Sequence, residues 1–159
     1  MNVKINTFFC RFFDVKRNVE KQKFMKPTHI EHIGIAVRNL DDAIELYERL
    51  LGLECYKIEE VADQKVRTAF FLIGQTKIEL LESTAPDGPI GKFIEKRGEG
   101  IHHIALSVEN IEEKLVETEQ AGITLIDKNP RKGADGLDIA FLHPKSTAGA
   151  LIEICSLAK

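Results

Sequence analysis

The sequence predicts an α+β fold built from two tandem copies of one β-α-β-β-β unit. The main observation is a self-match: residues 32–42, HIGIAVRNLDD, align without a gap with residues 103–113, HIALSVENIEE. In both places an apolar run of strand character is followed by Asn and a pattern of helical spacing. A self-match of this length indicates that one structural unit was duplicated.

Length and composition indicate a soluble globular protein. With 43% hydrophobic and 30% charged residues, the 159-residue chain is of ordinary globular composition and long enough for a real core. The net charge of −3 gives no bulk attraction to nucleic acid or to an anionic membrane, and no apolar run approaches the ~20 residues that span a bilayer. The three cysteines lie far apart without paired spacing, which predicts a reducing, cytoplasmic setting.

The expected domain organisation follows the repeat. Residues 1–25 fall outside it and are predicted to be an N-terminal extension, without the long apolar segment of a secretory signal. Residues 26–159 are expected to form a single domain. In it, module 1 (28–84) and module 2 (101–156) are joined by a linker at 85–100, whose Pro- and Gly-rich start marks a break.

In module 1, residues 28–37 read as a strand because their apolar residues alternate. Asn39 is a suitable N-cap for a helix that Gly52 would end. Strands are expected at 55–61, 65–73 and 77–81, with a turn at 74–75. Residues 90–97 in the linker are predicted to form a short helix.

Module 2 repeats this order. A strand starts at 101, Asn110 caps a helix, and Gly122 terminates it. Strands are expected at 123–126, 137–142 and 150–155. The residues between them form a Gly- and Lys-bearing loop at 129–136 and a long turn at 143–149.

The repeat singles out four residues with metal-binding chemistry. Each copy has one histidine at the start of its first strand and one glutamate in the middle of its last strand: His32, Glu79, His103 and Glu153. Each glutamate stands between two apolar residues, so alternation points it to the opposite face of the strand. A buried carboxylate without a partner costs several kcal/mol, so it is usually ion-paired or bound to a metal.

Taken singly, none of these residues would indicate a ligand, because a lone strand histidine is usually structural and a strand glutamate usually faces water. Their symmetric recurrence favours the metal interpretation. Two imidazoles and two carboxylates suit a divalent ion such as Co²⁺, Mn²⁺, Zn²⁺, Ni²⁺ or Fe²⁺. His29, His102 and His143 lie outside the symmetric pattern and are expected to be structural.

Four segments together resemble the methylmalonyl-CoA epimerases, a family of the vicinal oxygen chelate (glyoxalase/bleomycin-resistance) superfamily. They are HIGIAV (32–37), GIHHIA (100–105), FLHPK (141–145) and LIE (151–153). The resemblance covers about residues 28–156. It implies paired βαβββ modules whose mixed sheet curves around a metal, often within a homodimer. It also implies epimerisation of (2R)- and (2S)-methylmalonyl-CoA through an enolate.

By position, the family's metal ligands fall on His32, Glu79, His103 and Glu153, with Co²⁺ the expected ion. Many members have Gln where this chain has Glu79, and several have a proton-transferring glutamate where it has Thr68. Threonine is no base at neutral pH, so the family's two-base assignment does not carry over whole. We expect Glu153 to act on one face of the enolate, and Glu79 or a water held by Thr68 on the other.

Substrate contacts are expected at Thr68 and, in the shared His-Pro-Lys segment, at Lys145 and Ser146. Arg131 and Lys132 either meet anionic groups or are solvated surface charges. A glyoxalase I-type isomerase would use the same ligands, an extradiol dioxygenase two histidines and one glutamate, and a bleomycin-resistance-type protein no metal. The His-Pro-Lys segment and the acidic ligands favour the epimerase, acting on a small acyl-CoA with no nucleic-acid or membrane partner.

Overall fold

In a computed structural model of the protein, residues 25–158 are described, and all but the last residue of the extension expected at 1–25 lies outside them. The strands are β1 (His29–Ala36), β2 (Lys57–Val61), β3 (Val66–Ile73), β4 (Thr76–Ser83), β5 (Gly100–Ser107), β6 (Arg131–Lys132), β7 (Leu137–Leu142) and β8 (Ile152–Leu157). The helices are α2 (Leu40–Leu51), α3 (Pro89–Arg97) and α4 (Ile111–Gln120), with short 3₁₀ turns at Ala62–Gln64 and Pro144–Ser146.

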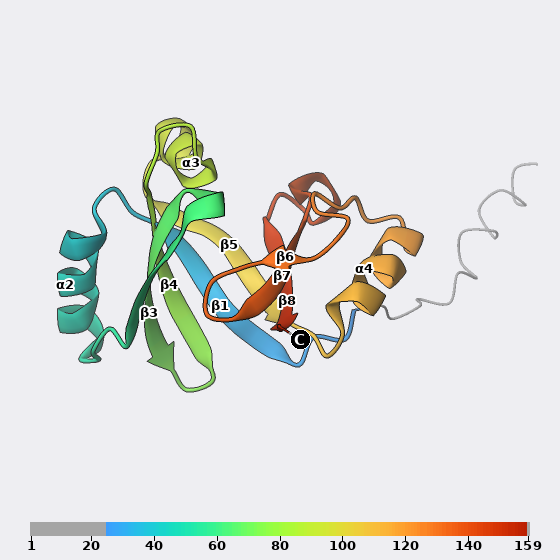
Figure 1. The fold of residues 1–159 in the computed structure, drawn as a ribbon, viewed down its shortest axis with the longest axis horizontal. Coiled ribbons are helices and arrows are strands. Elements are labelled where there is room, and N and C mark those ends of the chain that lie inside the picture. The colour runs from blue at the N-terminus through green and yellow to red at the C-terminus, as the bar shows by residue number, and fades with distance from the viewer. Residues whose placement is uncertain (1–24, 159) are drawn as a thin grey trace, which may run out of the picture.

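The strands form one mixed eight-stranded sheet in the order β2-β3-β4-β1-β5-β8-β7-β6. β1 and β5 pair antiparallel at its centre and so join the modules, while β1 with β4 and β5 with β8 pair parallel. Figure 1 shows the sheet curling about this central pair, with α2 and α4 at its two ends. The predicted pair of βαβββ modules is therefore confirmed.

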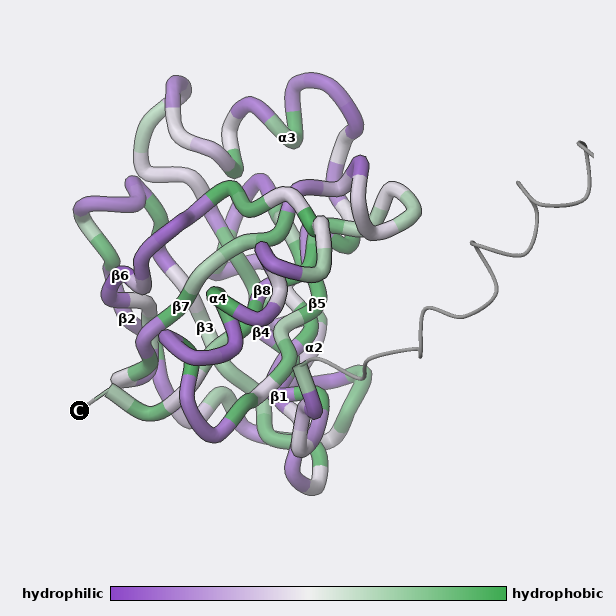
Figure 2. Tube along the Cα trace, turned by 90° about the vertical axis from the view of Figure 1, so that its right-hand side faces the viewer, coloured by the Kyte–Doolittle hydropathy of each residue, from purple (hydrophilic) through white to green (hydrophobic). Residues whose placement is uncertain are grey.

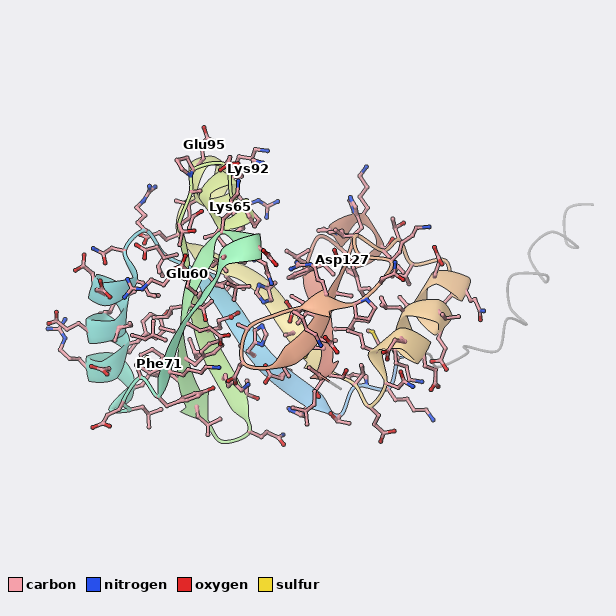
Figure 3. All side chains as sticks on the ribbon, viewed as in Figure 1. Glu60, Lys65, Phe71, Lys92, Glu95 and Asp127 are labelled. Atoms are coloured by element: carbon pink, nitrogen blue, oxygen red, sulfur yellow. The ribbon has the colours of Figure 1, made fainter. Side chains whose placement is uncertain are left out.

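Helix α2 forms where its caps were predicted. The Asn39 side chain accepts hydrogen bonds from the amides of Asp41 and Asp42, and Gly52 ends the helix at φ 66°, a left-handed conformation that glycine adopts without strain. Leu40 and Phe71, both fully buried, pack in the core between α2 and the sheet, and Figure 3 shows Phe71 on that side of β3. The helix thereby covers the outer face of module 1.

Module 2 departs from the prediction at residues 123–126, where no strand forms. In this segment only Leu125 forms a bridge, to Leu142. Further along the chain, the two-residue strand β6 pairs with β7 at the edge of the sheet. The carboxylate of Asp127 accepts the amide of Phe141 at 2.9 Å. This hydrogen bond occupies a backbone donor of β7 that a continuous edge strand would use. Pro130 has no backbone N–H to donate to β7. The edge strand beside β7 is therefore interrupted.

Helices α4 and α3 cover further parts of the sheet. α4 packs on β7 and β8 through Ile111 and Leu115, and the linker helix α3 packs through Ile90 and Ile94 on β1, β3 and β4. Figure 2 shows hydrophobic residues concentrated along the central strands and hydrophilic ones along most outer loops. No helix within residues 25–158 is long and apolar enough to cross a membrane.

Candidate metal centre and active-site cavity

The two strand glutamates point into the curve of the sheet. Ile78 and Leu80, which flank Glu79, pack against α2, and Ile152 and Ile154, which flank Glu153, pack in the core beneath α4. Alternation therefore turns both carboxylates to the opposite, concave face, where they are only 4% and 3% exposed. The apolar neighbours of each glutamate are thus the reason it is buried.

Two register shifts in the β1–β5 pair bring one further side chain beside each of the two ligand histidines. One falls between Ile30 and His32, and the other opposite Gly34 and Ile35, where the partner residue passes from His103 to Ile101. A bulge leaves one residue unpaired and re-aims its side chain. The extra residues are Glu31 and His102, and both line the same cavity as the histidines that follow them.

The four predicted ligands meet at one place. The Nε2 atoms of His32 and His103 lie 2.8 Å apart. Glu79 Oε2 is 3.3 Å from the first and 3.7 Å from the second, while Glu153 reaches them at 3.7 and 3.6 Å through Oε1 and Oε2. All four side chains are buried. The structure therefore brings together the set that the repeat singled out.

The extra residue of each bulge contacts the outer nitrogen of its histidine. Glu31 Oε2 lies 2.5 Å from His32 Nδ1, and His102 Nδ1 lies 2.9 Å from His103 Nδ1. Such a contact fixes the orientation of an imidazole and keeps its Nε2 turned to the opposite side. His102, expected to be structural, is thus part of the site.

Gly34 makes room for this arrangement. It pairs with His103 across the two central strands, and a Cβ placed on it would lie 2.3 Å from His103 Cε1. Any larger residue would therefore collide with the imidazole. A glycine inside a strand is the usual sign of such a close approach.

In the four-residue centre, buried carboxylates and imidazoles lie close enough to shift one another's pKa values. Burial lowers the pKa of His32, but Glu79, Glu31 and Glu153 more than compensate and raise that pKa to about 9. Burial raises the pKa of Glu79 and brings the pKa of Glu153 to about 8. Burial, with the like charge of His32, lowers the pKa of His103 well below its usual range. Without a cation, His32 and Glu153 therefore both hold protons at pH 7.

The donor set fits a divalent transition metal. Donor atoms of His32, His103 and Glu153 all lie within 4.8 Å of one another, and Glu79 lies against both histidines. Among the described residues, Glu153 Oε1 is buried with no hydrogen-bond partner, which is costly for a carboxylate unless a cation meets it. Two nitrogens and two oxygens with no thiolate suit ions of the Co²⁺ and Zn²⁺ class.

The four residues lie in a cavity of about 220 Å³ between the two modules. Its walls include Phe70 and Phe141 and the buried hydroxyl of Thr68, which has no hydrogen-bond partner within the described part of the chain. Asp135, in the loop before β7, lines the cavity from module 2, yet its ion-pair partners Lys57 and Lys77 belong to module 1. Ion pairs between the two modules therefore help to hold this part of the cavity wall.

The other predicted contact residues divide between this cavity and its surroundings. Arg131 lines the cavity, with its guanidinium 5.4 Å above the Phe141 ring. Lys132 is exposed and pairs with Asp138 at 2.7 Å. Lys145 is exposed outside the cavity, and the Ser146 hydroxyl accepts the Thr124 amide at 3.0 Å. Thr68 alone of the three predicted substrate residues faces the four ligands.

Sequence reasoning missed Glu31, Gly34, Lys77, His102 and Asp135. Two signals were available: a glycine inside an apolar strand, and an ionisable residue directly before each repeat histidine. Neither is decisive alone, because strand alternation would send Glu31 and His102 to the outer face. Only the two bulges turn them inward.

Comparison with known proteins agrees with this geometry. Residues 31–141 match the model of the Glyoxalase/Bleomycin resistance protein/Dioxygenase superfamily. The chain is 44% identical to the uncharacterized protein YqjC of Bacillus subtilis over 126 residues, 79% of this chain and 90% of that protein. It is 36% identical to the ethylmalonyl-CoA/methylmalonyl-CoA epimerase of Cereibacter sphaeroides over 127 residues, 79% of this chain and 95% of the relative.

Among solved structures, a variant of Streptomyces coelicolor methylmalonyl-CoA epimerase in complex with 2-nitronate-propionyl-CoA superposes with a TM-score of 0.80 at 36% identity. The match covers 83% of this chain and 96% of that one. The family model spans well over half of the sequence, and the curled mixed sheet is that of the epimerase structures. This chain belongs to the glyoxalase/bleomycin resistance protein/dioxygenase superfamily.

Proposed function

We propose that this protein interconverts (2R)- and (2S)-methylmalonyl-CoA with a divalent metal held by His32, Glu79, His103 and Glu153. The supporting observation is the pair of buried carboxylates from β4 and β8, which meet at the same two imidazoles inside a cavity between the modules. The epimerases of similar sequence and fold support the substrate class.

The C2 proton of the substrate lies between a thioester and a carboxylate and is only weakly acidic. When bound, the metal would act as a Lewis acid that stabilises negative charge developing on the oxygens of these two groups. Co²⁺ is the ion we expect at this set of donors. The reaction then needs proton transfer at both faces of a planar enolate.

Glu153 and Glu79 are the residues proposed to move this proton. They come from equivalent strands that flank the central β1–β5 pair on opposite sides, so the two carboxylates approach the centre from two directions. Burial raises both pKa values, as general bases that must also act as acids near neutral pH require. The hydroxyl of Thr68, in the same cavity, would hold substrate or a water beside Glu79.

The remaining residues shape and close the site. Glu31 and His102 keep the imidazoles in place through the Nδ1 atoms. Phe70, Phe141 and the loop that carries Asp135 enclose the cavity, which excludes water from the carbanion face.

The test is proton–deuterium exchange at C2 of methylmalonyl-CoA in D₂O, with protein first stripped by chelator and then restored with Co²⁺. We expect exchange to vanish on stripping and return with the ion. Absence of exchange in both states, with one metal still bound per chain, would move the function to a glyoxalase I-type isomerase or an oxygenase. Absence of metal binding would favour a metal-free ligand-binding protein.

We also propose that the protein works as a homodimer in the cytoplasm. The two described cysteines, Cys55 and Cys155, are free thiols, as in proteins of reducing compartments. Sedimentation of the purified protein would give the oligomeric state, and fractionation of the cells that make it would give the compartment.

A further inference from the structure

The carboxylate of Glu31 is held from two sides. It belongs to a residue that is only 7% exposed. Its Oε2 atom lies 2.5 Å from His32 Nδ1, and its Oε1 atom pairs with the ammonium group of Lys77. A carboxylate oriented in this way fixes the ring of a metal-binding histidine through the nitrogen that does not bind the metal. The lysine thus decides how Glu31 presents its second oxygen to the imidazole.

Lys77 is itself fixed by module 2. It lies in β4, in register with His32 on β1, and its side chain is only 15% exposed. Its Nζ atom lies 2.6 Å from Asp135 Oδ2. A lysine has a flexible stem and a point charge without directional preference, so two carboxylates are needed to hold its ammonium group in one place. Lys77 therefore bridges an acid of module 1 and an acid of module 2.

Asp135 reaches Lys77 from the loop at 133–136, which Figure 1 shows between β6 and β7. The backbone of Asp135 is left-handed, at φ 53°, a conformation that few residues other than glycine adopt. The hydrogen-bond partners of its side chain and amide all belong to module 1: Tyr56, Lys57, Glu59 and Lys77. Contacts with the other module thus support an unfavourable backbone conformation in this loop.

The duplicated half does not repeat this arrangement. In the aligned repeat, His102 takes the place of Glu31, and Leu151 takes the place of Lys77. His102 Nδ1 lies 2.9 Å from His103 Nδ1, but a leucine brings no charge to it. Of the two central imidazoles, His32 is therefore the one whose orientation depends on charges that extend into the other module.

We propose that Lys77 and Asp135 are positioning residues of the metal centre, and that they act on His32 through Glu31. The inference rests on the proposed function, which assigns His32 to the metal. Docking of the loop at 133–136 on module 1 and orientation of the metal-binding imidazole are then coupled. Because such coupling is reciprocal, a metal bound at His32 strengthens the docking of the loop.

A double-mutant cycle on Co²⁺ affinity tests this coupling. Glu31→Gln and Asp135→Asn each remove one negative charge, and independent losses of charge would weaken binding additively. We expect Glu31→Gln to weaken Co²⁺ binding on the order of tenfold or more, and Asp135→Asn on the order of fivefold. In the Glu31→Gln background, Asp135→Asn should have almost no further effect. The matched control is Asp138→Asn, which removes a charge from β7 that pairs with Lys132, and which should leave the affinity unchanged.

NMR of the metal-free protein gives a second readout that needs neither metal nor turnover. Because a carboxylate only accepts, the Nδ1 atom of His32 carries the proton that it shares with Glu31. The signal of this proton should shift in Lys77→Met and in Asp135→Asn, and stay unchanged in Asp138→Asn. The ring signals of His103 should stay the same throughout, and they report that each variant is folded.

A His32 signal that ignores Asp135→Asn, or additive losses of Co²⁺ affinity in the cycle, would overturn the coupling and leave the proposed reaction untouched. Wild-type protein that binds no Co²⁺, but whose His32 signal responds to Asp135→Asn, would contradict the proposed function. The link between the loop and the imidazole would then stand without the metal.

Discussion

Lys77 in β4 and Asp135 in the loop before β7 form an ion pair, Nζ to Oδ2 at 2.6 Å, that joins the two modules in the wall of the cavity. Asp135 also accepts from Lys57 at 3.0 Å, and its amide donates to Glu59. Lys77 further pairs with Glu31, the residue that contacts His32. One lysine therefore connects a loop that lines the cavity with the acid that orients a proposed ligand.

Removing this lysine should destabilise the protein and loosen the loop. Lys77→Met leaves the buried carboxylate of Glu31 and the half-buried carboxylate of Asp135 without their shared cation, so we expect a loss of about 1–3 kcal/mol in the free energy of unfolding. The control is Lys65→Met, whose partner Asp87 is exposed, and which should cost less than about 1 kcal/mol. Urea unfolding gives both values; equal losses would show that the inter-module pair has no special weight.

Gly34→Ala should displace the imidazole of His103. Because the new Cβ would lie 2.3 Å from the ring, the ring or the central strand must move, at about 1–3 kcal/mol of stability. We expect Co²⁺ affinity, measured by visible absorption, to fall about a hundredfold or more.

The matched variant is Gly52→Ala at the end of α2, where the backbone is left-handed but the space is open. It should lose about 1 kcal/mol of stability and keep its metal affinity. Unchanged Co²⁺ binding in Gly34→Ala would mean that His103 is not held against β1 as a ligand.

The substitution Glu79→Gln should reduce epimerisation while leaving proton removal from one epimer intact. With an amide at this position only Glu153 can act as a base, so one epimer should still exchange its C2 proton in D₂O while epimerisation falls by about a hundredfold or more. Metal should remain bound, since an amide oxygen can replace the carboxylate. The control, Glu82→Gln, changes a glutamate of the same strand that lies outside the cavity. If Glu79→Gln epimerised at the wild-type rate, Glu79 would not be one of the two bases.

Metal binding at pH 7 should release protons. The pKa values of His32, about 9, and Glu153, about 8, lie above 7, so the metal-free centre holds protons there that a cation must displace. Affinity for Co²⁺ should therefore increase as the pH rises from 6 toward 8. Titration calorimetry in buffers of different ionisation enthalpy counts the protons, and a heat of binding independent of buffer would contradict this balance.

Several features were readable from residues alone. The duplication predicted the two modules, and Asn39 and Gly52 marked both ends of α2. Glu79 and Glu153 could be placed on the concave face because apolar neighbours on both sides fix the alternation of a strand. The strand expected at 123–126 failed because the Asp127 carboxylate takes an amide of β7, and that bond depends on where the chain returns.

The sequence by itself determined the repeated unit, its helices and the four residues that converge. These follow from periodicity and capping, which act over a few neighbouring positions. The tertiary structure alone decided that Glu31 and His102 turn inward, that Gly34 lies under an imidazole, and that Lys77 meets Asp135. Each of these depends on how β1 pairs with β5 or on how one module faces the other. A one-residue shift in strand register sends a side chain to the opposite face of the sheet, but it does not change the order of apolar and polar residues along the strand.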